Sequence, residues 1–194
     1  MQHRHPTYKF EESLDKDLEA IAAIATSVFP EAFSREDIEK ELMNKKHRIY
    51  LAKDRGRIVG FNIWYEDKED GQVWDWLHAV HPDYRKSGIG SKLMNRVIER
   101  TRELGYSRIR LKVYENFHSM IRFCRRKGFV KIKVEKSDTW GDSKYSIYFQ
   151  YNLINNLKSP MPIPEPKPEV PVYLDVLQVN DSYIIGLSAS YVKN

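Results

Sequence analysis

Residues 76–105 restrict the possible folds of this chain more than any other stretch. They begin with the apolar run WLHAV, continue through a polar loop that contains Gly88 and Gly90, and end in residues that are apolar at every third or fourth position. This pattern predicts a buried strand, a glycine-containing loop and an amphipathic helix that stops at Gly105. The unit therefore predicts a fold in which helices pack on a sheet.

The flanking segments extend this plan in both directions. Alternating apolar residues predict strands over 7–13, in three runs between 47 and 81, over 108–114, and in a hairpin from 130 to 153. Helical spacing predicts helices over 14–29, over 34–43 and over 117–128. Ser34 and Asp37 have the spacing of a capping box at the start of the second helix. The order predicts a mixed α/β fold, with antiparallel strands first and a β-α-β step in the middle.

The composition changes at Ser159. Prolines at alternate positions from 160 to 168 exclude a helix and favour an extended, semi-rigid spacer. The segment after this spacer reads as two strands around an Asn-Asp turn. We therefore predict a domain over 1–157, a proline-rich linker over 158–171 and a β-hairpin tail over 172–194. Because an isolated hairpin is marginally stable in water, we expect the tail to dock on its own domain or on a second subunit, which would form a homodimer.

Composition narrows the cellular setting. No apolar run approaches the roughly 18 residues that a membrane span needs, and the first ten residues lack the apolar segment of a secretory signal. Cys124 is the single cysteine of the 194-residue chain, which excludes an intramolecular disulfide and a cysteine-based zinc site. These features predict a cytoplasmic protein that has no contact with the membrane and holds no metal.

Positive charge is concentrated in residues 85–133, which hold 15 Lys and Arg against 3 Asp and Glu in a chain of net charge +5. Two interpretations stay open: the charges solvate the surfaces of helices, or some of them bind a phosphate-bearing ligand. Nucleic acid would also suit such a stretch. However, the interleaved aromatic and basic residues of a known RNA-binding module are absent here, so we do not expect nucleic acid as a partner.

The loop before the central helix has the properties of a phosphate-binding loop. A helix N-terminus presents unpaired N–H groups, and Gly88 and Gly90 allow the backbone to approach anionic oxygen atoms closely. A dinucleotide-binding fingerprint would need a third glycine at the position of Leu93. A Walker loop would need a Gly-Lys-Ser/Thr sequence that does not occur here. An Arg-x-x-Gly-x-Gly loop remains, formed by Arg85, Gly88 and Gly90.

With its preceding strand, its following helix and the later segment FCRRKGF, this loop resembles that of the GNAT superfamily of acyl-CoA-dependent N-acyltransferases. The resemblance covers roughly residues 7–153. It implies a GNAT-like fold, with a central twisted, mostly antiparallel sheet and helices on both faces, and acetyl-CoA as the co-substrate. It also implies that residues 78–80 pair with the pantetheine arm and that residues 86–91 hold the pyrophosphate. The expected cofactor-binding residues are His78, Ala79, Val80, Arg85, Lys86, Ser87, Gly88, Ile89, Gly90, Ser91 and Asn116.

Transfer of an acyl group to an amine needs a base for the amine, whose reference pKa is about 10.4 for lysine, and a proton for the leaving thiolate. Three residues near the expected site are candidates for the base: Asp75, His78 and Glu115. The resemblance implies a tyrosine as the acid, four residues before Gly128, but that position is Cys124. Either Cys124 supplies the proton or it packs in the core. In the second case Tyr114 or Tyr145 would replace the missing hydroxyl.

The resemblance implies an N-acetyltransferase that transfers the acetyl group of acetyl-CoA directly to a primary amine on a peptide N-terminus, a lysine or a small molecule. Four tryptophans either line an aromatic acceptor pocket or fill the core: Trp64, Trp74, Trp76 and Trp140. Four acidic residues would suit a cationic amine: Glu31, Glu66, Asp67 and Asp75. The alternative is a non-catalytic GNAT-like module that binds CoA or RNA, which the absent tyrosine and the basic segment both favour.

Overall fold

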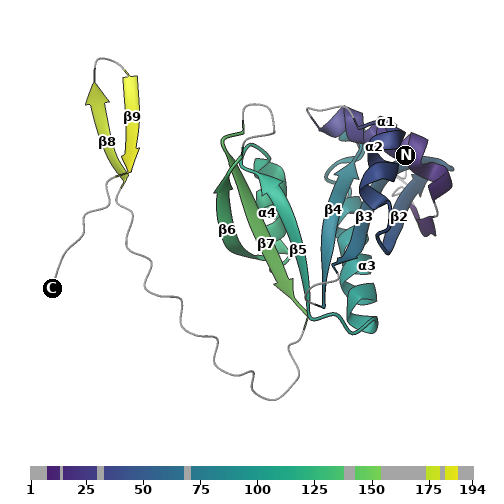
Figure 1. Cartoon of the computed structure of the whole chain (residues 1–194). Helices are drawn as coiled ribbons and strands as arrows, with labels where there is room; N and C mark the ends of the chain where they lie inside the picture. The colour runs from purple at the N-terminus through teal and green to yellow at the C-terminus, as the bar shows by residue number, and fades with distance from the viewer. Residues whose placement is uncertain are drawn as a thin grey trace, which may run out of the picture. The chain divides into compact units, whose positions relative to one another are not determined.

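In the computed structural model, the described residues are 8–13, 15–29, 33–67, 71–137 and 143–153, together with the backbone of 174–179 and 182–187. The chain divides into two units, residues 1–155 and 156–194. The first unit is built on a seven-stranded sheet with the strand order β1-β2-β3-β4-β5-β7-β6 (Figure 1). Its strands are β1 (Lys9–Ser13), β2 (His47–Asp54), β3 (Arg57–Asp67), β4 (Gln72–Val80), β5 (Arg108–Tyr114), β6 (Val130–Lys136) and β7 (Tyr145–Asn152).

Every neighbouring pair in this sheet is antiparallel except β4 and β5, which are parallel. The helices are η1 (Asp15–Asp17), α1 (Leu18–Val28), α2 (Arg35–Leu42), η2 (Pro82–Tyr84), α3 (Ile89–Glu103) and α4 (His118–Arg126). These elements confirm the predicted mixed α/β fold and its element order.

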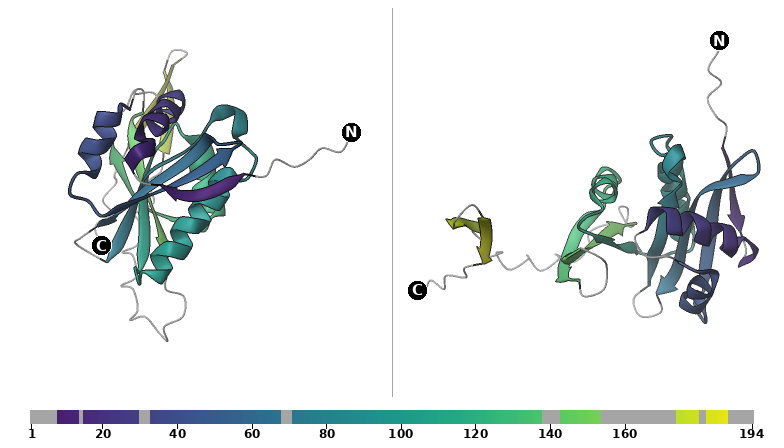
Figure 2. Two further views of the ribbon diagram at one scale, coloured as in Figure 1. Left: turned by 90° about the vertical axis from the view of Figure 1, so that its right-hand side faces the viewer. Right: turned by 90° about the horizontal axis from the view of Figure 1, so that it is seen from above.

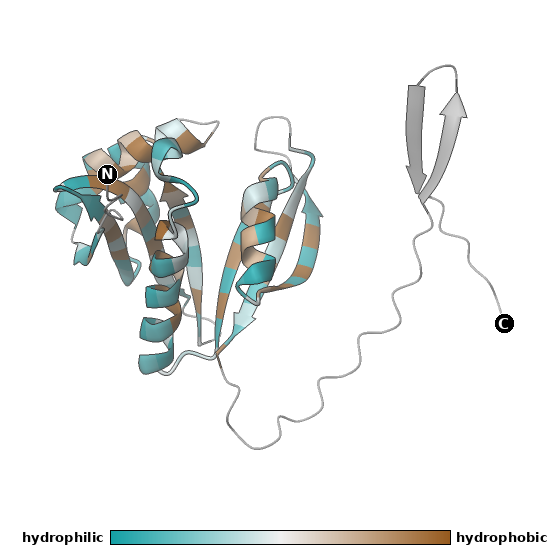
Figure 3. Cartoon of the chain, turned by 180° about the vertical axis from the view of Figure 1, so that it is seen from behind, coloured by the Kyte–Doolittle hydropathy of each residue, from teal (hydrophilic) through white to brown (hydrophobic). Residues whose placement is uncertain are grey.

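Helices cover both faces of the sheet, as predicted (Figure 2). α1 and α2 pack on a core that includes Leu51 and Phe61, whereas α3 packs on the opposite face, against Tyr50 and Trp64. Seen from behind, α3 and α4 lie in front of the strands, and α3 shows one apolar and one polar side (Figure 3). Two cores therefore sandwich the sheet, and side chains alternate between them along each strand because strand residues alternate in direction.

β4 and β5 diverge after a short parallel ladder. Their pairing joins Gln72–Trp74 to Arg108–Arg110, and the register contains no later pair between these strands. From Asp75 onward β4 therefore leaves β5, as Figure 1 shows. The backbone edge of β4 that would continue the ladder faces a space between the two halves of the sheet.

A β-bulge lies where this divergence begins. Ile63 of β3 faces Leu77, but the next residue, Trp64, faces Asp75, so Trp76 is an extra residue in β4. In a regular strand, residues three positions apart point to opposite faces. The bulge removes this alternation, and both Asp75 and His78 lie on the face that α3 covers. Bulges often redirect side chains next to active sites.

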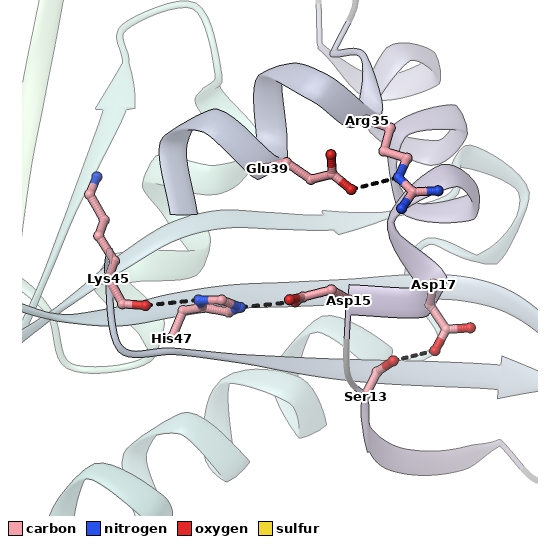
Figure 4. Close-up of polar contacts among 7 residues, drawn as sticks. All are labelled: Ser13, Asp15, Asp17, Arg35, Glu39, Lys45 and His47. Carbon is pink, nitrogen blue, oxygen red and sulfur yellow. Dashed lines mark hydrogen bonds and ion pairs between the residues drawn. The ribbon is translucent and has the colours of Figure 1, made fainter. Parts of the chain in front are cut away.

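Hydrogen bonds and ion pairs stabilise α2 and join η1 to strands of the sheet (Figure 4). Ser34 caps α2: its hydroxyl accepts a hydrogen bond from the Asp37 N–H at 3.0 Å, and the Asp37 carboxylate accepts one from the Ser34 N–H at 3.0 Å. This confirms the predicted capping box. His47 joins β2 to η1 through a contact of 3.0 Å between its Nε2 atom and Asp15 Oδ1. Arg35 and Glu39 form an ion pair one turn apart, at 2.6 Å.

The second unit contains β8 (Leu174–Val179) and β9 (Ser182–Leu187), which pair antiparallel from Leu174↔Leu187 to Val179↔Ser182. Both strands agree with the sequence-based expectation for the tail. The turn between them and the linker over 158–171 lie outside the described residues, and the boundaries at 157 and 171 stay predictions. Within the described part of the chain, no helix is both long and apolar enough to cross a membrane.

Trp64 is a core residue, which decides between its two predicted roles. Its side chain is fully buried against α3. We expect Trp64→Ala to lower the free energy of unfolding by about 3–5 kcal/mol, because the substitution leaves a cavity. Trp74→Ala is the matched control, since Trp74 is only half-buried and should cost less. Urea denaturation of both variants measures the difference, and equal losses would contradict this assignment.

Candidate active site

The space between the diverging strands is a cleft of about 1300 Å³. Its walls come mainly from β4, β5, the start of α3, one side of α4 along its length, and the connection between α1 and α2. Of the expected cofactor-binding residues, all but Ser87 line this one cleft. Ser87 instead donates its hydroxyl to the Tyr84 carbonyl. Asn116, which precedes α4 and is distant from the loop in the sequence, lines the same cleft as the loop and the end of β4.

The glycine loop, residues 85–90, leads into the N-terminus of α3. Lys86 and Gly88 have positive φ angles, of 62° and 84°, and Gly88 is the N-cap of the helix. A positive φ is unstrained for glycine, which explains the residue at position 88. Arg85 folds back and donates from its Nε atom to the Val80 carbonyl at 3.3 Å. The loop thus ends at the N–H groups of the first turn of α3, which have no acceptors within the helix.

Gly90 lies where α3 passes closest to β4. A Cβ atom at this position would lie 3.4 Å from Nε2 of His78 and 3.6 Å from a methyl group of Val80. The absence of a side chain therefore keeps the first turn of α3 close to the end of β4. The arrangement brings three elements of an anion site together: a helix N-terminus, a glycine-rich turn and the side chains of Arg85 and Lys86.

Three polar side chains are buried beneath the cleft: Asn62, Asp75 and His78. Asn62 donates from Nδ2 to Asp75 Oδ1, and the same nitrogen lies 3.3 Å from Nδ1 of His78. The His78 Nδ1 atom is 4.0 Å from Asp75 Oδ2, and the two side chains are only 6% and 1% exposed. Asp75 Oδ2 has no hydrogen-bond partner among the residues that the structure describes.

Burial changes the acid–base properties of this cluster. It raises the pKa of the Asp75 carboxyl to about 7, although the hydrogen bond from Asn62 favours the ionised form. Burial also lowers the pKa of His78 to about 4, with the positive charge of Lys127 acting in the same direction and a hydrogen bond to the Gly90 backbone opposing it. The pKa of Asp75 is therefore shifted toward neutral pH, where His78 is uncharged.

The other catalytic candidates lie elsewhere. Cys124 is fully buried in the core with α3, and burial together with the Asp75 charge raises its pKa to about 12. This is the environment of a packed core residue rather than of a proton donor. Glu115 turns from the cleft and accepts a hydrogen bond from the Lys144 N–H at 2.8 Å. Of the two alternative hydroxyls, Tyr114 lines the cleft, while Tyr145 is 42% exposed at the start of β7.

Neither Asn62 nor Lys127, which contact the buried cluster and the start of α3, was predicted to belong to the site. Asn62 was visible in the sequence as a single polar residue inside the apolar run IVGFNIW. Lys127, at the end of α4, donates to the Ser91 carbonyl at 3.2 Å and to Asn95 Oδ1 at 2.7 Å. It thereby connects α4 to α3, and burial lowers its pKa. Nothing in the local sequence around Lys127 indicates this contact.

The predicted acceptor residues separate into different environments. Trp74 and Trp76 line the cleft, and Trp140 lies outside the described residues. Among the acidic residues expected to attract a cationic amine, Asp75 alone lines the cleft in the described part of the chain. Glu66 forms an ion pair with Lys46 at 2.7 Å, and Asp67 accepts a hydrogen bond from Gln72 at 2.9 Å. Glu31 is not among the described residues.

Residues 18–129 match the model of the acetyltransferase (GNAT) family. An amino-acid acetyltransferase of Aeromonas salmonicida is 29% identical over 102 residues, which are 53% of this chain and 21% of that protein. The amino-acid acetyltransferase of Shewanella oneidensis is 30% identical over 115 residues, which are 59% of this chain and 23% of that protein. The chain thus spans about a fifth of the length of these curated relatives.

Solved structures share the fold. The ribosomal-protein-S18-alanine N-acetyltransferase from Escherichia coli has a TM-score of 0.69 at 16% identity, with 79% of this chain and 100% of that one covered. Ard1 from Thermoplasma volcanium has a TM-score of 0.66 at 23% identity, with 76% and 98% covered. At these identities the likeness concerns the arrangement of strands and helices.

Proposed function

The chain belongs to the GNAT family of acetyltransferases, and we propose that it transfers an acetyl group from acetyl-CoA directly to a primary amine. The observation that carries this proposal is the cleft between β4 and β5, which joins the glycine loop to a buried acid–base cluster. The name of the curated relatives makes free amino acids candidate acceptors.

The residues of the cleft fit acetyl-CoA as a co-substrate. No strand pairs with the inner edge of β4 over 78–80, so an extended chain can pair with it as an added strand would, apart from the Val80 carbonyl, which accepts from Arg85. The helix N-terminus at Gly88 and the side chains of Arg85 and Lys86 suit a pyrophosphate. Acetyl-CoA would supply the thioester that is attacked. The protein would orient the thioester and move protons.

We assign the base to Asp75. A base works best when its pKa lies near the working pH, and the pKa of Asp75 is about 7 whereas that of His78 is about 4. His78 and Asn62 would position the carboxylate. For the acid we favour Tyr114, because its hydroxyl belongs to a residue of the cleft wall and Cys124 is in the core.

The first prediction concerns co-substrate binding. We expect Arg85→Ala and Gly90→Asp each to raise the dissociation constant of acetyl-CoA about tenfold or more. A tenfold increase corresponds to a loss of about 1.4 kcal/mol of binding free energy. The first variant removes a positive charge, and the second places a negative charge at the mouth of the anion site. Isothermal titration measures the dissociation constants. Arg102→Ala, at the exposed far end of α3, is the control and should bind normally. No binding of acetyl-CoA to the unmodified chain at millimolar concentration would contradict the proposal.

The second prediction concerns pH. Because Asp75 must be ionised to accept a proton, kcat/KM should rise with pH through about 7 and then level off with respect to this group. Asp75→Asn should lower kcat/KM by about 10²–10⁴-fold and remove this limb of the profile. A second limb, from deprotonation of the acceptor amine, should stay in both proteins. A variant that keeps the limb near pH 7 would show that another group is the base.

Turnover also separates this proposal from its alternative. A chain that binds acetyl-CoA but acetylates no amine in a broad panel would be the non-catalytic module. RNA binding that weakens steeply with salt would identify nucleic acid as its ligand.

We also propose that the chain forms a homodimer through its C-terminal tail, and that it works in the cytoplasm, for which its single cysteine is the support. The support for the dimer is the β8–β9 pair, since a two-stranded sheet is marginal without a partner surface. Sedimentation equilibrium of the full chain should give twice the 23.0 kDa of one copy. A mass of one copy at micromolar concentration would contradict the dimer.

A further inference from the structure

A series of aromatic rings crosses the cleft on the side of α1 and α2. Phe33 contacts Trp76 of β4 with ring centroids 6.3 Å apart, and it contacts Phe29 at 5.6 Å. Phe29 in turn contacts Phe117, at the N-cap of α4, at 6.0 Å, and Phe117 contacts Tyr114 of β5 at 6.5 Å. We call these five residues the aromatic series. It joins the half of the sheet that ends at β4 to the half that begins at β5.

The aromatic series forms a wall of the same cleft as the glycine loop. All five residues line the cleft. Phe29, Phe33 and Trp76 also pack against the core under α1 and α2, so they lie on the face opposite to α3. An acceptor that entered from this side would contact the rings first, and its amine would reach Asp75, on the α3 face, through the gap between β4 and β5. Aromatic rings of this kind favour apolar or aromatic side chains.

Two charged side chains of the cleft lining, Glu41 and Lys112, lie beside the aromatic series and have different partners. Glu41 lines the cleft, but its carboxylate forms an ion pair with Lys45 and accepts a hydrogen bond from the Tyr65 hydroxyl at 3.3 Å. Lys112, on β5, is exposed and lines the cleft, with its Nζ atom 5.1 Å from the centre of the Tyr114 ring. The charge of Glu41 is therefore compensated by a direct ion pair. The Lys112 ammonium group contributes to lowering the pKa of Glu135 on β6, and it also lies next to the Tyr114 ring in the lining of the cleft.

We propose that the acceptor is a free α-amino acid with a large apolar side chain, and this inference rests on the proposed acetyltransferase function. The apolar side chain lies among Phe29, Phe33 and Trp76, and the carboxylate pairs with Lys112. In the reaction, a bond forms between the α-nitrogen and the acetyl carbon as the carbon–sulfur bond of the thioester breaks. One amine proton passes to Asp75, and the thiolate of CoA receives a proton from Tyr114. The products are an N-acetylamino acid and CoA.

The substrate class is tested by release of the CoA thiol from acetyl-CoA, using the purified full chain and matched amines. L-Phenylalanine should have a kcat/KM about tenfold or more above those of L-alanine and L-lysine, because a filled apolar pocket discriminates by roughly this factor. L-Phenylalaninamide keeps the ring and the amine but lacks the carboxylate, and it should react less well than L-phenylalanine. A peptide that begins with phenylalanine should be a poorer substrate for the same reason.

Variants at two residues, Phe33 and Lys112, test which side chains produce the preference. Phe33→Ala should reduce the ratio of kcat/KM for L-phenylalanine over L-alanine, and Phe33→Leu should restore part of it. Lys112→Met should reduce the ratio for L-phenylalanine over its amide. Since Lys112 is exposed on β5, this variant is expected to fold. The dissociation constant of acetyl-CoA, measured in parallel, should stay the same in all three variants.

The outcomes separate the two levels of inference. If L-lysine, the amide or the peptide reacts as well as L-phenylalanine, the proposed substrate class is wrong while acetyl transfer stands. An unchanged L-phenylalanine preference in both Phe33→Ala and Lys112→Met would also overturn the assignment. If acetyl-CoA binds and no amine reacts, the proposed function itself fails, and this inference fails with it.

Discussion

The parallel ladder between β4 and β5 covers three residues of each strand, and the geometry of the site depends on where it stops. Beyond Trp74 the two strands separate, so the inner edge of β4 keeps backbone donors and acceptors that a continuous sheet would have used. Buried backbone groups need partners, and an extended ligand can supply them. The same separation leaves room for the start of α3 on one side and for the aromatic series on the other.

The bulge at Trp76 positions the ionisable side chains next to this space. It places Asp75 and His78 on the face covered by α3, where Asn62 lies between them. Burial of a carboxyl group costs folding free energy unless it is well hydrogen-bonded, and here one carboxylate oxygen lacks a partner among the described residues. The raised pKa of Asp75 is the direct result of that burial. Because burial both destabilises the ionised carboxylate and raises its pKa to about 7, Asp75 is suited to exchange protons near neutral pH.

Local features of the fold were predictable from the sequence, and long-range ones were not. The capping box at Ser34 and the glycine at position 88 depend on neighbouring residues, so their patterns could be interpreted directly. The bulge has no residue signature, because it arises from the register between β3 and β4. The two roles predicted for Cys124 could be separated only by the packing of α3 and α4, and the contact of Phe29 with Phe117 joins segments far apart in the chain.

The central claim is that the end of β4 and the loop before α3 form one binding site for acetyl-CoA. Hydrogen–deuterium exchange of the full chain, with and without saturating acetyl-CoA, tests the location of that site. We expect slower exchange of the backbone amides over 78–80 and 86–91 when the ligand is present. Unchanged exchange in both segments, with protection elsewhere or nowhere, would contradict the claim.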